Sequence, residues 1–209
     1  ISYGSVSRGA IYALQGRGFN NLHVFTRRPV HLVADQNPDV YYYHLFKKDN
    51  EYLGQPPIGN SKKFLDEISE SDIIINGILQ DPVDPSMFVR NDQIKLLKRN
   101  TLIIDVSCDE GMGFEFAVPT SFKDPIINLE NNIKYYSVDH SPSYLWNAAS
   151  REISKALIPY LVELIDSGFD FHNNITLRKA IEIENGEILN KKILNFQKRA
   201  ENYPHLFIK

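Results

Sequence analysis

Two segments of the chain carry the side chains best suited to chemistry. Residues 105–115 read Asp-Val-Ser-Cys-Asp-Glu-Gly-Met-Gly-Phe-Glu, so that Asp109 follows an apolar run and stands beside flexible glycines. Residues 138–147 hold His140 in a turn that also contains a proline. A carboxylate can stabilise a positive charge as it forms, and a histidine titrates near neutral pH. A solvated acidic loop and a structural histidine would explain the same residues, so both interpretations stay open.

The chain begins with a turn suited to a phosphate. Residues 2–10, Ser-Tyr-Gly-Ser-Val-Ser-Arg-Gly-Ala, form a degenerate version of the G-x-G-x-x-G loop, with Ser2, Gly4 and Ser7 in the three glycine places. The retained glycine would let the backbone approach a pyrophosphate, and the N–H groups of the following helix would face the anion. We predict pyrophosphate contacts from Gly4, Ser5, Val6 and Ser7. A plain Gly/Ser turn before a helix would look similar.

The residues after the next expected strand indicate which dinucleotide is bound. An Asp or Glu usually stands there and accepts a hydrogen bond from the ribose 2′-hydroxyl of NAD, whereas this chain has Thr26, Arg27 and Arg28. A guanidinium pairs with a 2′-phosphate that a carboxylate would repel. We therefore predict that the cofactor is NADP (NADPH) and that these three residues contact it. Two solvated arginines in a turn are the alternative.

A further cofactor contact is expected after the following apolar run. Residues 76–80 read Asn-Gly-Ile-Leu-Gln, in which a glycine permits close approach of a ligand. We include Gly77 and Leu79 among the predicted cofactor contacts. A plain exit from strand to loop would explain this segment equally well.

Apolar periodicity predicts the elements that position these residues. A helix should follow the glycine loop, and residues 30–59 show no clean period, so we expect them to be irregular. The remaining expectations are strands at 22–26, 72–79, 101–106 and 133–138, helices at 61–71, 92–99 and 148–165, and a helical, charged tail at 172–209.

Alternation of helix and strand predicts an α/β fold, namely a Rossmann-like doubly wound parallel sheet with C-terminal helices. Only Ile1 precedes the glycine loop, so we expect this sheet to lack its first strand and to fold poorly alone. Residues 1–147 are predicted to form a dinucleotide-binding domain truncated at its N-terminus. Residues 148–209 should form helices that pack on it or on a missing N-terminal substrate domain.

Composition excludes several classes of function. The formal net charge is −3 and basic residues are spread among acidic ones, so we expect no nucleic-acid partner and no membrane association. A single cysteine, Cys108, excludes an internal disulfide and any multi-cysteine zinc site, and it agrees with a cytoplasmic protein. We expect no metal site.

The two acidic and histidine-containing segments resemble the carboxyethylornithine synthase family, within the alanine dehydrogenase and nicotinamide nucleotide transhydrogenase superfamily. The resemblance runs from Ser2 to about Ile165. Asp109 matches the second acid of a D-x-x-x-D-x-G-G segment, and Met112 departs from it. The resemblance implies an NADPH-dependent reductive condensation of pyruvate with the side-chain amine of ornithine or lysine. Asp109 and His140 would then lie near the nicotinamide in supporting catalytic roles.

The same resemblance implies that the principal catalytic residues lie in an N-terminal substrate domain, so this chain should be inactive alone. Its partners would be a keto acid and a basic amino acid, with a homo-oligomer possible. Alternatives are a saccharopine or alanine dehydrogenase, which NAD use would favour, and a non-enzymatic NADP-binding module. A methyltransferase ranks last, because it usually needs an acid after the second strand.

Overall fold

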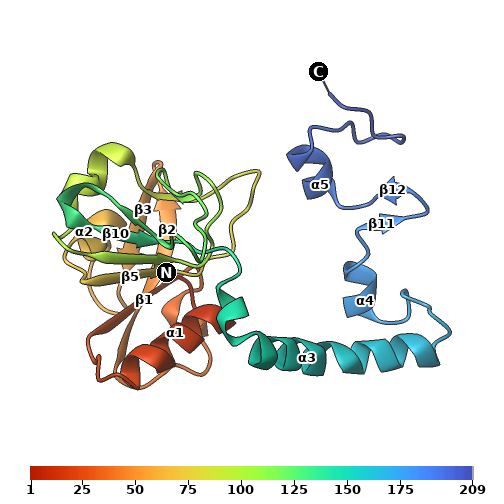
Figure 1. Ribbon diagram of the computed structural model, residues 1–209, viewed down its shortest axis with the longest axis horizontal. Helices are drawn as coiled ribbons and strands as arrows, with labels where there is room; N and C mark the ends of the chain where they lie inside the picture. Colours follow the sequence, from red (N-terminus) through yellow and green to blue (C-terminus); the bar gives the residue numbers. More distant parts are fainter. Residues whose placement is uncertain (209) are drawn as a thin grey trace. The chain divides into compact units, whose positions relative to one another are not determined.

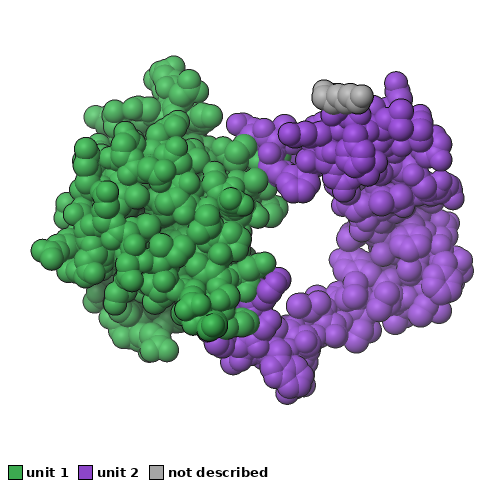
Figure 2. Space-filling model, turned by 45° about the horizontal axis from the view of Figure 1, so that its top comes forward, with its two compact units in different colours: residues 1–81, 85–139 green, residues 82–84, 140–209 purple. Residues whose placement is uncertain are grey.

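The structure, a computed structural model, describes residues 1–208. It divides into two compact units (Figures 1 and 2). The first unit comprises residues 1–81 and 85–139, and the second comprises residues 82–84 and 140–209. The predicted division at residues 147 and 148 stays a prediction.

The first unit alternates helices and strands, in agreement with the predicted α/β class. Its elements are α1 (Ser5–Gln15), β1 (Leu22–Thr26), the 3₁₀ helix η1 (Val30–Leu32), β2 (Val40–Lys48), β3 (Glu51–Gln55), β4 (Lys62–Lys63), α2 (Phe64–Ser69), β5 (Ile73–Asn76), β6 (Met87–Val89), η2 (Asn91–Leu96), β7 (Leu102–Asp105), β8 (Gly113–Phe114), β9 (Ile126–Asn128), η3 (Glu130–Asn132) and β10 (Lys134–Tyr136).

The strands form two four-stranded sheets, ordered β1-β2-β3-β4 and β5-β7-β10-β9, and a short β6-β8 pair. Parallel pairing joins β1 to β2, β5 to β7 and β7 to β10. Antiparallel pairing joins β2 to β3, β3 to β4 and β9 to β10. The sheets are therefore mixed, whereas the sequence led us to expect parallel strands throughout.

The antiparallel part arises where the prediction of an irregular segment at 30–59 was wrong. β2 and β3 form a hairpin with a two-residue turn at Asp49 (φ 49°) and Asn50 (φ 64°). Two consecutive positive φ angles match the twist of a hairpin, and Asp and Asn tolerate them well. The tyrosines of β2 are exposed, buried and partly buried in turn, so the sequence shows no regular alternation of apolar and polar residues there.

The first two residues lie between the two sheets. The amine of Ile1 donates to the carbonyl oxygen of Ile75 at 2.6 Å, and the N–H of Gly77 donates to the carbonyl oxygen of Ile1 at 3.1 Å. On the other side, the N–H of Ser2 donates to the carbonyl oxygen of Phe25 at 2.7 Å. Ile1 and Ser2 thus make the bonds of a strand that is parallel to β1 and β5.

Two apolar clusters support this unit. The larger surrounds Ile103, Phe114 and Tyr135, which are fully buried, and Ile1 packs against its edge. The smaller contains Tyr3 and Tyr42, and it joins α1 to β1 and β2. Burial of such side chains supplies most of the favourable free energy of folding. The start of the chain therefore lies at the boundary between the two clusters.

The second unit contains η4 (Ser141–Leu145), α3 (Trp146–Asp166), α4 (Ile175–Lys179), β11 (Ile183–Glu184), β12 (Glu187–Ile188) and α5 (Lys191–Phe196). The helix predicted at 148–165 is confirmed, with two further residues at its start and one at its end. The prediction of a helical tail over 172–209 was wrong, because α4 and α5 are short and a hairpin separates them. Asn185 (φ 50°) and Gly186 (φ 86°) form its turn, an Asn-Gly pair that favours hairpins.

Other predicted boundaries shift. The helix expected at 61–71 is limited to α2, and the one expected at 92–99 is the 3₁₀ helix η2. The short strands β6, β8 and β9 were not expected, because each has only two or three residues. Among residues 1–208, no helix is long and apolar enough to cross a membrane.

Candidate dinucleotide site

The N-terminus of α1 offers unpaired backbone donors. Gly4 is the N-cap residue, and the first backbone bond back to it comes from the N–H of Arg8 at 2.9 Å. The N–H groups of Ser5 and Val6, which are exposed, precede that bond and have no partner within the helix. The first turn contains no acidic residue. Partial positive charge at this end of an 11-residue helix suits a phosphate.

The two serines in the glycine places have structural roles. Ser2 adopts φ 87°, a conformation that favours glycine, and its hydroxyl oxygen accepts from the N–H of Gly4 at 3.3 Å. Ser7 is buried, and its hydroxyl donates to the carbonyl oxygen of Ile1 at 3.3 Å. Ser7 thus uses its hydroxyl proton within the loop, whereas Ser2 only accepts there and its O–H can still donate to a phosphate, as can the backbone N–H groups of the helix start.

Gly77 explains how the chain accommodates Ser7. A Cβ atom at Gly77 would lie 2.8 Å from Oγ of Ser7 and 3.6 Å from Cγ1 of Val6. The third glycine of the loop normally allows helix and strand to approach closely. Here the space is provided from the other side, because the residue after β5 has no side chain. Gly77 also uses its N–H in the bond to Ile1.

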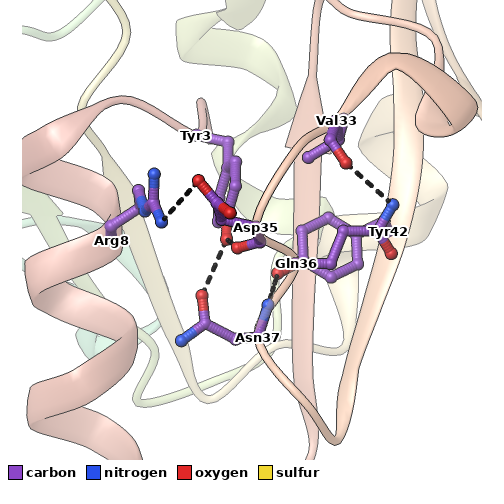
Figure 3. Close-up of polar contacts among 7 residues, drawn as sticks. All are labelled: Tyr3, Arg8, Val33, Asp35, Gln36, Asn37 and Tyr42. Carbon is purple, nitrogen blue, oxygen red and sulfur yellow. Dashed lines mark hydrogen bonds and ion pairs between the residues drawn. The ribbon is translucent and has the colours of Figure 1, made fainter.

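A polar network attaches the glycine loop to the segment after β1 (Figure 3). The hydroxyl of Tyr3 contacts the carbonyl oxygen of Asp35 at 2.5 Å and Oδ1 of Asn37 at 2.8 Å. The N–H of Asn37 donates to the hydroxyl oxygen of Tyr42 at 2.8 Å, and burial raises the pKa of Tyr42 to about 12. The guanidinium of Arg8 lies 5.2 Å from the centre of the Tyr3 ring. Sequence analysis missed this network, since its members are separated by more than 30 residues in places.

The end of β1 places the predicted phosphate-binding residues in different surroundings. Thr26 is buried, and its hydroxyl oxygen accepts from the N–H of Arg28 at 3.3 Å. Nη2 of Arg27 donates to the hydroxyl oxygen of buried Ser86 at 2.7 Å. Arg28 is exposed. Arg27 is exposed as well, so what distinguishes it is the bond that fixes its guanidinium to Ser86.

The ends of β5 and β7 meet through a buried carboxylate. Asp105 accepts from Nδ2 of Asn76 at 3.0 Å, from the hydroxyl of Tyr135 at 2.9 Å and from the N–H of Cys108 at 3.2 Å. Burial is the largest influence on Asp105 and raises the pKa of this carboxyl, while the bond from Tyr135 opposes the shift. Asp105 therefore fixes the loop that leads to Asp109, rather than facing solvent.

That loop presents Asp109 as an exposed carboxylate. The carbonyl oxygen of Asp109 accepts from the N–H of Met112 at 3.0 Å, and Gly111 has φ 65° in the same turn. Sγ of Cys108 lies 4.0 Å from Oδ1 of Asp139. Burial, followed by the nearby carboxylates, raises the pKa of Cys108 to about 11. The thiol is consequently protonated at neutral pH and unsuited to act as a nucleophile.

The other predicted site residues are exposed. Leu79 retains 88% of its surface accessible, which suits contact with a ligand but does not define one. His140 is exposed, adopts φ 66° and precedes η4 in the second unit. Asp109 belongs to the first unit, so the expected proximity of Asp109 and His140 stays a prediction. Within residues 1–208, no group of three or more His, Cys, Asp or Glu side chains could hold a metal ion.

A sequence profile of the alanine dehydrogenase/PNT C-terminal domain matches residues 31–191, which is most of the chain. The chain belongs to this family. Domains of the alanine dehydrogenase/PNT family bind NAD(P), and the family's members are oxidoreductases. The matched range begins after the glycine loop, so Gly4 and its neighbours are supported by their geometry alone.

Individual members of the alanine dehydrogenase/PNT family show different degrees of similarity. N(5)-(carboxyethyl)ornithine synthase of Clostridium botulinum is 42% identical over 91 residues, covering 44% of this chain and 28% of that protein. Alanine dehydrogenase 1 of Staphylococcus aureus is 25% identical over 128 residues, covering 60% of this chain and 34% of that protein. The chain thus spans about a third or less of these relatives.

A solved structure of L-alanine dehydrogenase shares the fold. It superposes with a TM-score of 0.66 at 17% identity, and the match covers 92% of this chain and 50% of that one. The predicted Rossmann-type architecture is confirmed at this level.

Proposed function

We propose that the chain is the cofactor-binding part of an NADPH-dependent oxidoreductase that condenses pyruvate with the side-chain amine of ornithine or lysine. The observation that carries this proposal is the 42% identity to a carboxyethylornithine synthase, which exceeds the 25% identity to alanine dehydrogenase 1. The pair Arg27 and Arg28, standing where NAD enzymes place an acid, supports NADP as the dinucleotide.

The residues present fit a dinucleotide in three places. The backbone N–H groups of Ser5 and Val6, two exposed residues, would hold the pyrophosphate, and Arg28 would pair with the 2′-phosphate. Gly4 leaves room for a ligand, because a Cβ atom there would have only Oγ of Ser2 nearby, at 3.8 Å. When bound, NADPH would supply the hydride. The protein would position the cofactor against the substrate and provide the charged groups around them.

Asp109 is the residue of this chain that we assign to charge stabilisation. Its carboxylate is exposed on a loop fixed by Asp105, and it would favour an iminium cation formed by the two substrates. Fixing the loop in advance matters, because a preorganised charge needs no rearrangement during the reaction. His140 would support the same site.

The test is NADPH oxidation by the full-length gene product, given pyruvate with and without ornithine or lysine. Oxidation that needs both substrates supports the proposal. Oxidation of NADH with pyruvate and ammonia would instead favour an alanine dehydrogenase, and oxidation of NADH with 2-oxoglutarate and lysine a saccharopine dehydrogenase. Tight NADPH binding without turnover on any pair would favour a binding module. The role of Asp109 is tested separately: Asp109→Asn should lower turnover and leave the affinity for NADPH nearly unchanged.

A further inference from the structure

Arg27 is fixed to a buried serine on another segment of the first unit. Nη2 of its guanidinium donates to the hydroxyl oxygen of Ser86 at 2.7 Å. Arg27 follows β1 and is exposed, whereas Ser86 directly precedes β6 and retains only 2% of its surface accessible. The bond joins residues that are 59 positions apart. It holds in one place a long side chain that would otherwise sample many rotamers.

The choice of acceptor leaves the Arg27 guanidinium able to bind an anion. A serine hydroxyl is neutral, so the bond to Ser86 does not neutralise the positive charge as a carboxylate would. A guanidinium carries five N–H donors in a planar arrangement with two forks, and Nη2 contributes one hydrogen to each fork. The bond to Ser86 uses one of these hydrogens, which leaves one complete fork. A phosphate accepts such a fork through two of its oxygens.

Two backbone bonds fix Ser86 in turn. Its N–H donates to Oε1 of Gln80 at 3.0 Å, and its carbonyl oxygen accepts from the N–H of Gly113 at 2.7 Å. Gln80 lies in the segment after β5, and Gly113 is the first residue of β8. Ser86 is thus anchored to two other segments of the first unit. Its hydroxyl cannot shift without the loss of one of these bonds.

The side chain of Gln80 contributes through its oxygen. Gln80 is 8% exposed, and within residues 1–208 its Nε2 has no hydrogen-bond partner. A buried donor without a partner lowers stability, so packing alone does not favour glutamine at this position. Gly113 leaves space for this amide, since a Cβ atom there would lie 3.2 Å from Nε2 of Gln80. The favourable contact of this amide is therefore the bond to the N–H of Ser86.

Arg27 lies close in sequence to the strand end that contacts the glycine loop. The N–H of Ser2 donates to the carbonyl oxygen of Phe25 in β1, and the N–H of Gly77, after β5, donates to the carbonyl oxygen of Ile1. The glycine loop thus starts between the ends of these two strands. In dinucleotide-binding folds, the residues after the β1 position face the ribose of the adenosine half. Arg27, two residues after Phe25, would be on that side of the cofactor.

We infer that Ser86, held by Gln80, is a positioning residue for cofactor choice, and that it fixes the guanidinium of Arg27 so that its complete fork meets the 2′-phosphate of NADPH. This inference rests on the proposed use of NADPH and is independent of the substrates. A side chain that is already ordered loses less conformational entropy when a ligand binds. The bond to Ser86 should therefore raise the affinity for a ligand with a 2′-phosphate and leave the affinity for one without it unchanged.

The test uses the full-length gene product and two probes that differ only in the 2′-phosphate, namely adenosine 2′,5′-bisphosphate and adenosine 5′-monophosphate. Isothermal titration calorimetry gives the ratio of their affinities and does not require turnover. Ser86→Ala should lower the preference for the bisphosphate about three- to tenfold, because the Arg27 side chain must then be ordered on binding. Ser86→Thr keeps a hydroxyl and should retain most of the preference.

Two controls separate positioning from a general effect on the fold. Ser137→Ala removes another buried hydroxyl, which donates to the carbonyl oxygen of Val118 at 2.6 Å, and it should leave the preference unchanged. In an Arg27→Ala background, Ser86→Ala should have no further effect on the preference. A positioning residue acts only through the residue that it holds, so the two substitutions should not be additive.

The outcomes distinguish this inference from the proposed function. A wild-type protein that binds both probes equally would overturn NADPH as the cofactor, and the positioning role with it. A preference for the bisphosphate that survives Ser86→Ala, or that Ser86→Ala lowers equally with and without Arg27, would overturn the positioning role alone. Equal losses for the two probes would also overturn it, because Ser86 would then support the adenosine site in general.

Discussion

Oγ of Ser7 occupies the space that a side chain at Gly77 would need, since a Cβ atom there would stand 2.8 Å from it. Close packing between α1 and the strand end is thus retained even though the third glycine of the loop is a serine. The residue without a side chain at this contact is Gly77, after the strand, instead of the third residue of the glycine loop. Both residues also bond to the carbonyl oxygen of Ile1, through the Ser7 hydroxyl and the Gly77 N–H.

Gly77→Ala should destabilise the protein by about 1–3 kcal/mol, the usual cost of overpacking a well-filled site. Chemical denaturation measures this change. The double variant Ser7→Gly with Gly77→Ala should recover most of the loss, because the clashing hydroxyl is removed. Gly9→Ala is the matched control: nothing lies within 4 Å of its added Cβ, and alanine favours helix, so stability should be unchanged or rise. Independent, additive losses in the double variant would contradict the close contact.

The two arginines after β1 should contribute unequally to cofactor choice. Arg28→Ala should weaken NADPH binding by about tenfold or more while NADH binding changes little, because an exposed charge-assisted bond to the 2′-phosphate is lost. Titration of both cofactors by fluorescence gives the ratio. Ser86→Ala removes the hydroxyl that bonds to the guanidinium of Arg27. If Arg27 also binds the 2′-phosphate, this variant should change the affinity for NADPH. A loss of equal size for NADH and NADPH in Arg28→Ala would remove the 2′-phosphate assignment.

Asp105 and Asp109 should differ in what they support. Asp105→Asn should lower the free energy of unfolding by about 1–3 kcal/mol, because the new amide group would face donors that now bond to a carboxylate. Asp109→Asn, at an exposed position, should change stability by no more than about 0.5 kcal/mol. Urea unfolding of both variants checks the difference. Equal losses would mean that Asp109 is also a structural residue.

In a polypeptide prepared with a free amine at Ile1, stability should depend on pH through that amine, and a peptide bond at the same place would abolish the effect. The pKa of the amine is 8.0 ordinarily and about 5 in the folded chain, so between these values the unfolded chain binds more protons. The free energy of unfolding therefore rises as pH increases from 5 to 8, by up to about 4 kcal/mol at 1.36 kcal/mol per unit. Comparing the chain with its N-acetylated form isolates this effect, since every histidine is common to both. Parallel pH profiles for the two forms would show that the amine is not buried.

The sequence was sufficient to predict the α/β class, the strands at 22–26 and 101–106, and the long helix at 148–165, because each has a strong apolar pattern. It was not sufficient for β2 and β3. Tyr41 and Tyr43 share a face of β2 yet differ in exposure, so the sequence lacks the strict alternation of apolar and polar residues that would predict this strand. Their turn, Asp49 and Asn50, lacks the glycine that usually marks a hairpin.

The candidate site shows the same limit. Residue types and spacing led us to predict site residues such as Gly4, the pair Arg27 and Arg28, and Asp109, since phosphate binding and charge stabilisation need particular groups after particular strands. They could not identify the attachment of Arg27 to Ser86 or of Tyr3 to Asn37, because these contacts depend on how distant segments pack. Whether the predicted residues meet around one cofactor stays a prediction.

The contact between Ser7 and Gly77 also limits the order in which substitutions at these two positions can accumulate during evolution. A form with glycine at position 7 and a larger residue at position 77 would be free of the clash, as is the present form. Single substitutions connect the two without steric conflict only through a chain that has glycine at both places. The same serine is therefore tolerated or harmful according to a residue 70 positions away, and its effect cannot be transferred between relatives that differ there.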